Sequence, residues 1–194
     1  MINGILIPGG AGLIGTLLDI AWETLADRTA HVEAITWATP RDILDVDPEP
    51  FVRTHVEAAL QRAEEVATSV GAMARPGRPK ARPVLIAKSL GSYAAALAAD
   101  RELPAIWLTP LLTRPPVVEA ITRNPAPQLL IGGTADRRWW DAAAARATGK
   151  RVLTIENGTH SLRVPGPVRN FTEVLGTVGT AIEEFLDEAA AQAT

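Results

Sequence analysis

A serine, an aspartate and a histidine in this sequence could together activate a hydroxyl nucleophile. Ser89 lies in LIAKSLGSYAAALAA, Asp136 in LLIGGTADRRWW and His160 in ENGTHSLRV. A nucleophilic serine needs a base that takes its proton, and the base needs an acid that fixes its tautomer. The chain has no cysteine, which excludes a thiolate nucleophile, disulfides and thiolate metal sites together.

The residues around Ser89 fit a sharp turn from a strand into a helix. Ala87 lies two residues before the serine and Gly91 two residues after it. Such a turn needs small side chains at both positions, because the backbone folds back on itself there. A serine that precedes a helix is also a common N-cap, whose hydroxyl accepts a hydrogen bond from the first turn. Taken alone, the motif leaves both interpretations open.

The possible partners of Ser89 follow predicted strands. His160 lies in a polar loop directly after the last strand, and Asp136 follows the strand before it. Loops at the carboxyl ends of parallel strands are where ligands and catalytic groups collect in open α/β sheets. Asp136 could instead cap a helix that begins near Trp139. The other two histidines, His31 before a strand and His55 within a helix, are predicted to be surface or packing residues.

Short β-rich segments alternate with longer segments of helical period along the chain. This pattern is typical of a parallel sheet with helices on both faces. The longest predicted helices cover residues 49–73 and a segment from Phe171 to Ala189. We therefore expect a three-layer α/β/α sandwich with a mostly parallel sheet, as one domain over residues 1–194. The sheet should hold about six strands, at 4–8, 32–37, 83–88, 104–109, 128–133 and 151–156.

Composition and charge restrict the partners. The chain has 194 residues, of which 47% are hydrophobic and 21% charged, as in a globular protein, and its net charge of −3 favours neither nucleic acid nor anionic membrane as a partner. Met1 leads almost directly into a predicted strand and no apolar run approaches a membrane span, so we expect a cytoplasmic protein. The stretch ARPGRPKARP at 74–83 is predicted to be a solvated loop, because its prolines block a helix.

An acidic series at residues 42–49 could suggest a cation site. Pro50 stands where a calcium loop requires glycine, and no histidine lies near. We interpret the series as a solvated loop that leads into a helix, whose first turn favours negative charge. No metal site is predicted.

The stretch GILIPGGAGLIGTLL at 4–18 has the glycine spacing of a dinucleotide-binding loop. A short-chain dehydrogenase would need a lysine four residues after its tyrosine, but the only tyrosine, Tyr93, has Leu97 at that offset. No carboxylate ends the second predicted strand to bind a ribose. Thr16 and Leu17 stand where a P-loop needs lysine and serine or threonine. The sequence therefore disfavours both nucleotide-binding classes.

The order Ser89, Asp136, His160, each just beyond a different strand, resembles the α/β-hydrolase superfamily. AKSLGS is similar to its nucleophile elbow, GGTAD to its acid loop and GTHSL to its histidine loop, and the likeness covers nearly the whole chain. Two strands that open the fuller fold have no counterpart, and the interval between strands 104–109 and 128–133 leaves no room for a cap domain. The resemblance is therefore to small, capless members such as dienelactone-hydrolase relatives, with serine in place of their cysteine nucleophile.

This resemblance implies a serine hydrolase that cleaves a small ester through an acyl-enzyme and needs no cofactor. Ser89 would attack the acyl carbon, His160 would act as base, and Asp136 would hold the imidazole. An oxyanion hole is expected from the N–H of Leu90 and a second N–H in the loop PGGAG, for which Gly10 is preferred and Ala11 is the alternative. Possible pocket residues are Ala11, Lys88, Leu111 and Trp139, although we expect the Lys88 side chain to point to solvent rather than toward an anionic substrate.

Other interpretations stay open at this point. A protein of the same fold could bind a small molecule or a partner without turnover, and an NAD(P)-binding protein similar to short-chain dehydrogenases is a more distant alternative. The sequence does not choose among ester, thioester and amide substrates, nor does it give the acyl chain length or the oligomeric state.

Overall fold

Parallel strands in a single sheet carry the fold. The computed structural model describes residues 2–13, 15–71 and 82–192. Within these residues the sheet has six strands in the order β2-β1-β3-β4-β5-β6, and every neighbouring pair is parallel. The strands are β1 (Ile2–Ile7), β2 (Thr29–Ala34), β3 (Val84–Lys88), β4 (Ala105–Leu108), β5 (Gln128–Gly133) and β6 (Arg151–Ile155).

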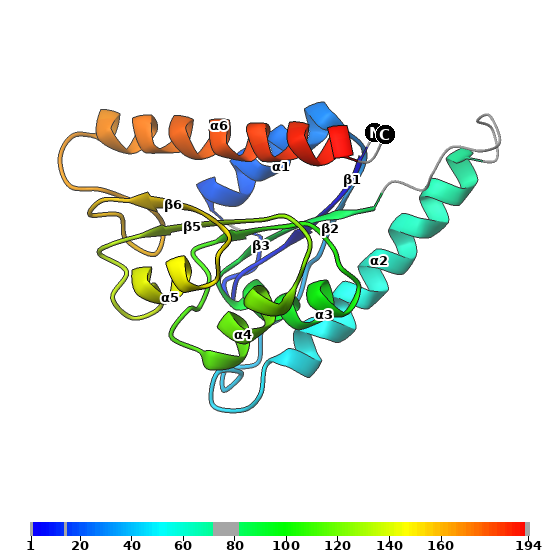
Figure 1. Ribbon diagram of the computed structural model, residues 1–194, viewed down its shortest axis with the longest axis horizontal. Coiled ribbons are helices and arrows are strands. Elements are labelled where there is room, and N and C mark those ends of the chain that lie inside the picture. Colours follow the sequence, from blue (N-terminus) through cyan, green and yellow to red (C-terminus); the bar gives the residue numbers. More distant parts are fainter. Residues whose placement is uncertain (1, 14, 72–81, 193–194) are drawn as a thin grey trace.

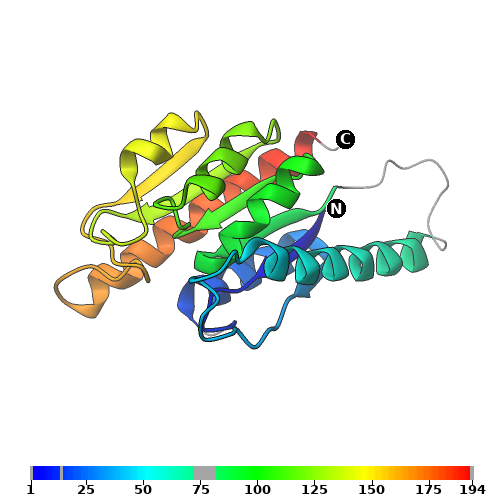
Figure 2. The same ribbon diagram turned by 90° about the horizontal axis from the view of Figure 1, so that it is seen from below.

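Helices cover both faces of this sheet. Figure 1 shows α1 and α6 on one face and the other helices on the opposite face, which Figure 2 presents toward the viewer. The helices are α1 (Thr16–Arg28), α2 (Glu49–Gly71), α3 (Ala95–Asp100), α4 (Pro115–Arg123), α5 (Ala142–Ala147) and α6 (Val168–Gln192), with a 3-10 helix, η1 (Ser89–Ala94), before α3. This is the predicted three-layer sandwich, and it is confirmed in the minimal form without a cap domain.

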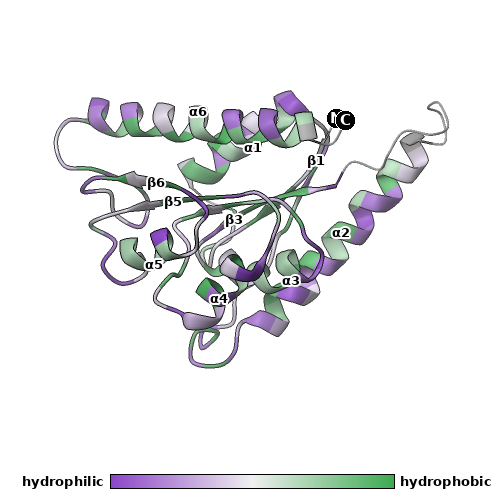
Figure 3. Cartoon of the chain, viewed as in Figure 1, coloured by the Kyte–Doolittle hydropathy of each residue, from purple (hydrophilic) through white to green (hydrophobic). Residues whose placement is uncertain are grey.

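Side chains of β3 alternate between two separate cores. Leu85 and Ala87 belong to the core under α2 to α5, whereas Ile86 belongs to the core under α1 and α6. All three are fully buried, as a central parallel strand requires. Figure 3 shows the matching pattern in α6, whose apolar side faces the sheet and whose hydrophilic side faces outward.

Several element boundaries differ from the sequence prediction, and the strand predicted at 4–8, for example, is observed as β1 (Ile2–Ile7). The strand predicted at 32–37 begins three residues earlier, as β2 (Thr29–Ala34), because α1 passes into it without a loop and its C-cap Thr29 is already extended. The helix predicted at 49–73 is observed as α2 up to Gly71. Its last two residues, and most of the loop predicted at 74–83, lie outside the described residues.

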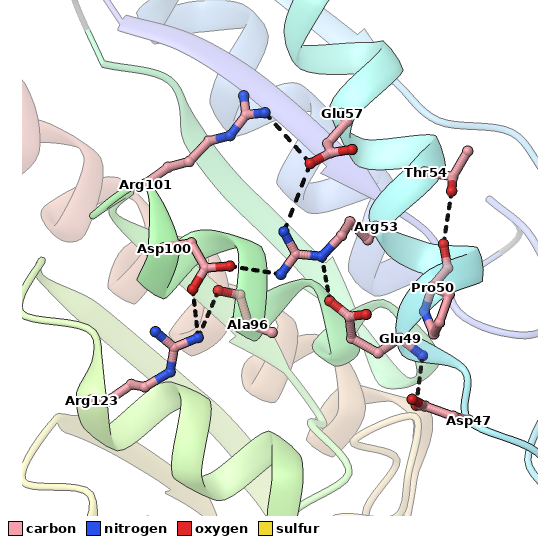
Figure 4. Close-up of polar contacts among 10 residues, drawn as sticks. All are labelled: Asp47, Glu49, Pro50, Arg53, Thr54, Glu57, Ala96, Asp100, Arg101 and Arg123. Carbon is pink, nitrogen blue, oxygen red and sulfur yellow. Dashed lines mark hydrogen bonds and ion pairs between the residues drawn. The ribbon is translucent and has the colours of Figure 1, made fainter.

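A chain of ion pairs joins α2, α3 and α4 on the outer surface (Figure 4). Arg53 donates to Asp100 at 2.7 Å, and Asp100 also accepts from Arg123 at 2.7 Å. The bond from Arg53 is the main cause that holds the pKa of the Asp100 carboxyl below its usual value. Within the acidic series, Asp47 accepts from the backbone N–H of Glu49 at 3.0 Å and so begins α2. The end of the series thus forms the start of the helix, as predicted, while Asp42 and Asp45 are exposed in the turn before it.

No helix in the described ranges is long and apolar enough to cross a lipid bilayer. What the fold provides for chemistry is the carboxyl edge of the sheet. Because all strands are parallel, the loops that follow β1, β3, β5 and β6 meet at that edge.

Candidate active site

Ser89 lies at the turn between β3 and η1 in a backbone conformation that few non-glycine residues adopt. Its φ is 50°, in the left-handed region. A methyl group at Gly91 would lie 2.9 Å from the carbonyl oxygen of Pro8, so only glycine fits there. Ala87 is fully buried between its strand partners on β1 and β4. The structure thus has the sharp turn that the small residues predicted.

The loop after β5 and the loop after β6 are locked together through their backbones. A methyl group at Gly133 would lie 2.1 Å from the carbonyl oxygen of Gly158, which leaves no space for any side chain. The N–H of Ala135 donates to the same Gly158 oxygen at 3.0 Å, and the N–H of Asn157 donates to the Thr134 hydroxyl at 2.7 Å. These contacts fix the distance between the segments that carry Asp136 and His160.

Ser89, His160 and Asp136 form one hydrogen-bonded chain. His160 Nδ1 lies 2.5 Å from Asp136 Oδ2, and His160 Nε2 lies 2.8 Å from Ser89 Oγ. The Asp136 side chain is 4% exposed and that of His160 30%. A carboxylate only accepts, so it selects the tautomer with hydrogen on Nδ1 and leaves Nε2 as the acceptor for the serine hydroxyl. The structure therefore brings together the three residues that the sequence singled out.

The two capping alternatives are wrong. In the described part of the chain no backbone amide donates to the Ser89 hydroxyl, whose partner is His160. The cap of α5 is Asp141, which accepts from the amides of Ala143 and Ala144 at 2.8 and 2.9 Å. Asp136 is thereby free of a capping role and directs its carboxylate to the imidazole.

The glycine loop after β1 lies against Ser89. A methyl group at Gly9 would come within 3.3 Å of the Ser89 Cβ. The carbonyl of Gly9 accepts from the N–H of Gly12 at 3.1 Å and from the indole N–H of Trp37 at 3.0 Å. Gly10, whose N–H shares a peptide plane with this carbonyl, lines the same cavity as Leu90. The two residues that carry the predicted oxyanion donors therefore both line the cavity that includes Ser89.

This cavity has a volume of about 280 Å³. It contains all four predicted pocket residues together with Ser89 and His160. Its lining is Gly9, Gly10, Ala11, Gly12, Ile43, Leu44, Lys88, Ser89, Leu90, Leu111, Trp139 and His160. Most of its side chains are apolar, so the space suits a short hydrocarbon group next to the serine.

Sequence reasoning missed Trp37, Ile43 and Leu44. The available signal was the pair Ile43 and Leu44 inside the acidic stretch DILDVD. Two adjacent aliphatic side chains are not expected in a loop that is fully exposed to solvent. Ile43 is buried and Leu44 partly buried, while the acidic residues beside them are exposed. Trp37 packs against Phe51 and His55 of α2, with ring centroids 5.4 and 5.6 Å away.

Lys88 is less exposed than expected from the sequence. It is partly buried and is one of the residues that line the cavity. Burial lowers the pKa of its ammonium group, and the negative charge of Asp136 opposes that shift. The reason for the difference is its place at the end of the central strand β3, where the loops of neighbouring strands surround it.

Tyr93, which the dehydrogenase alternative would use, is 7% exposed and belongs to the core under α2. His31, predicted to be a surface or packing residue, lies 3.4 Å from Glu33 on the edge strand β2. In the described ranges no cluster of three or more histidine, aspartate or glutamate side chains has the arrangement of a metal site.

Comparison with known proteins gives structural neighbours only. No family model and no curated protein sequence matches the chain. Est1E from Butyrivibrio proteoclasticus, solved with ferulic acid, superposes with a TM-score of 0.63 at 15% identity, over 98% of this chain and 90% of that one. XC6422 from Xanthomonas campestris, described as an α/β serine hydrolase without lid, has a TM-score of 0.60 at 18% identity, over 95% and 82%.

Dienelactone hydrolase from Anabaena variabilis superposes with a TM-score of 0.58 at 17% identity, over 97% of this chain and 86% of that one. The predicted resemblance to the capless α/β-hydrolases is therefore confirmed at the level of the fold. At these identities the comparison carries the fold and not the activity.

Proposed function

We propose that this protein is a serine hydrolase that cleaves small carboxylic esters through an acyl-enzyme. The observation that carries the proposal is the hydrogen-bonded chain from the buried Asp136 through His160 to Ser89, at the wall of a cavity. Distances of 2.5 and 2.8 Å are within the reach that proton transfer requires.

The first half of the proposed reaction forms the acyl-enzyme. His160 Nε2 takes the proton of the Ser89 hydroxyl while Oγ attacks the carbonyl carbon of the ester. Asp136, which accepts from Nδ1, stabilises the imidazolium that results. The imidazolium then returns the proton to the leaving alcohol as the tetrahedral intermediate collapses. In the second half, water attacks the acyl-enzyme with His160 again as base and releases the carboxylic acid.

Backbone amides would stabilise the charge on the tetrahedral intermediate. Leu90 follows Ser89 in η1, and Gly10 lies in the loop that packs on Ser89, so their N–H groups can converge on one oxygen. Gly10 has open space around its Cα, which leaves room for the carbonyl oxygen of a substrate. We assign the oxyanion hole to these two donors.

The lining of the cavity and the structural neighbours of the protein both favour a small ester as substrate. Aliphatic walls from Ile43, Leu44 and Leu111 suit a short acyl group, and the volume of about 280 Å³ leaves little space for a long chain. The fold is shared with Est1E, which was solved with ferulic acid, and with a serine hydrolase that has no lid. These likenesses support the choice of a small carboxylic ester.

Labelling of the serine tests the proposal. We expect a fluorophosphonate probe to label the native protein and to leave the Ser89→Ala variant unlabelled. The matched control is Ser69→Ala, because Ser69 is exposed on α2, away from the cavity. Native protein and control should hydrolyse 4-nitrophenyl acetate or butyrate, whereas Ser89→Ala should not.

A non-catalytic binding protein of the same fold is the rival function. It would predict equal labelling of all three proteins, or none, and no ester hydrolysis above the uncatalysed rate. That result would overturn the hydrolase proposal.

A further inference from the structure

Lys88 is the one lysine or arginine among the described residues that line the cavity, and the carboxylate of Asp136 offsets only part of the cost of burying its charge. It directly precedes Ser89 and belongs to the same lining. Within the described ranges its ammonium group has no hydrogen bond or ion pair, in contrast to Arg53 and Arg123, which are paired on the surface. The remaining lining residues carry no formal charge apart from a protonated His160.

Such a charge is costly to hold without a partner. Partial removal from water destabilises an ammonium ion unless an anion or acceptors replace the lost solvent. The lowered pKa of Lys88 reports this cost, and the Asp136 carboxylate compensates for only part of it. An anionic group of a bound ligand would supply the missing partner.

The surroundings of Lys88 favour a ligand with one apolar and one anionic part. The acidic residues Asp42 and Asp45 are exposed beside the cavity wall, whereas Ile43 and Leu44 line it. The guanidinium of Arg138 lies 4.6 Å from the centre of the ring of Trp139, which is another lining residue. The cavity thus offers aliphatic contacts and positive charge, and none of its described lining residues carries a carboxylate that would repel an anion.

We propose that Lys88 recognises a carboxylate on the acyl part of the substrate, so that the preferred esters are monoesters of short dicarboxylic acids. This inference rests on the proposed function, because it names the substrate class of the same site. The acyl part stays attached to Ser89 during the reaction, and Lys88 is its neighbour in the chain. A carboxylate there would be held in both halves of the reaction.

A pair of matched esters tests the inference. Mono-4-nitrophenyl adipate carries the carboxylate, and 4-nitrophenyl 6-oxoheptanoate replaces it with a neutral methyl ketone of similar shape. We expect the native protein to prefer the adipate ester in kcat/KM by roughly tenfold to hundredfold, the range of a charge-assisted hydrogen bond. The preference should diminish as the salt concentration rises.

Variants at Lys88 separate recognition from other roles. Lys88→Met keeps the length of the side chain without its charge and should abolish the preference, mainly by lowering kcat/KM for the adipate ester. Lys88→Arg should retain most of it. The control Arg146→Met changes the net charge equally at an exposed position of α5 and should leave the preference intact.

The results of these experiments distinguish a failure of the anion-site inference from a failure of the proposed function. An equal loss for both esters in Lys88→Met, or no preference in the native protein, would overturn the inference while Ser89-dependent labelling still supports a hydrolase. If labelling and hydrolysis both fail, the proposed function is wrong, and calorimetry with adipate decides the inference. Adipate that binds the native protein more tightly than Lys88→Met supports the anion site, and equal or absent binding rejects it.

Discussion

Trp37 fixes the direction of the Gly10 N–H without touching it. The indole N–H of Trp37 donates to the carbonyl of Gly9 at 3.0 Å, across 28 residues of sequence. That carbonyl and the N–H of Gly10 belong to one planar trans peptide group, in which they point in opposite directions. Holding one end of the group therefore orients the other, which is the proposed oxyanion donor.

Replacing Trp37 with phenylalanine should lower kcat with little change in KM. The aromatic contacts with Phe51 and His55 can persist, while the hydrogen bond to Gly9 is lost. We expect a loss of roughly tenfold, below the 10²–10³ that follows removal of an oxyanion donor itself. Steady-state kinetics on a chromogenic ester measures it.

The matched control is Trp22→Phe, because Trp22 is 40% exposed on α1. A change in KM alone, or a fall in melting temperature that accounts for the lost activity, would speak against this positioning role.

Replacing Asp136 with asparagine should lower kcat by roughly 10³- to 10⁴-fold, because an amide no longer selects the tautomer with hydrogen on Nδ1. KM should change little, since the 4% exposed carboxylate faces the imidazole rather than the cavity. The control Asp141→Asn keeps a capping residue on α5 and should retain native activity. A kcat for Asp136→Asn within tenfold of the native value would refute the assignment of the acid.

The Gly133→Ala variant should lose about 1–3 kcal/mol or more of unfolding free energy, because the new methyl group meets the Gly158 carbonyl and the backbone cannot retreat. Urea denaturation measures the loss. Gly176→Ala, in α6 with nothing within 4 Å of the added methyl, should gain about 0.5–1 kcal/mol from its better helix propensity. Equal effects of the two substitutions would mean that the two loops are not locked as the structure has them.

Stability should depend on pH through Lys88. Its pKa is lowered from 10.5 in the folded protein, so folding disfavours the charged form. The penalty is complete below the folded-state pKa and disappears as the pH rises toward 10.5. Lys88→Met, which has no such penalty, should gain stability over the native protein at pH 7, and the gap should narrow at alkaline pH.

Urea titrations of both proteins at several pH values measure this gap. Tyr93, whose pKa is raised mainly by burial, titrates in both proteins and cancels in the comparison. A gap that stays constant up to pH 10.5 would contradict a penalised ammonium.

The sheet and the hydrogen-bonded chain could be predicted because both depend on local patterns. Apolar runs indicate buried strands, and the glycines near Ser89 and Asp136 indicate tight turns at strand ends. In a parallel sheet the carboxyl ends of the strands lie at one edge, so these turns come close together. Trp37 could not be assigned, because its partner Gly9 lies on another strand's loop and no periodicity connects them. The partial burial of Lys88 was not predicted for a related reason: the loops that cover it follow other strands of the sheet.

The contact between Gly133 and Gly158 has a consequence for how this protein can change. It holds Asp136 and His160 through backbone atoms, whereas Ile43 and Leu44 line the cavity from the separate loop that connects β2 to α2. Substitutions in that loop alter the size of the cavity without moving the proton-transfer groups. Divergence in acyl preference, in nature or in the laboratory, should therefore accumulate at and around Ile43 and Leu44, while Trp37 and the two glycines stay invariant.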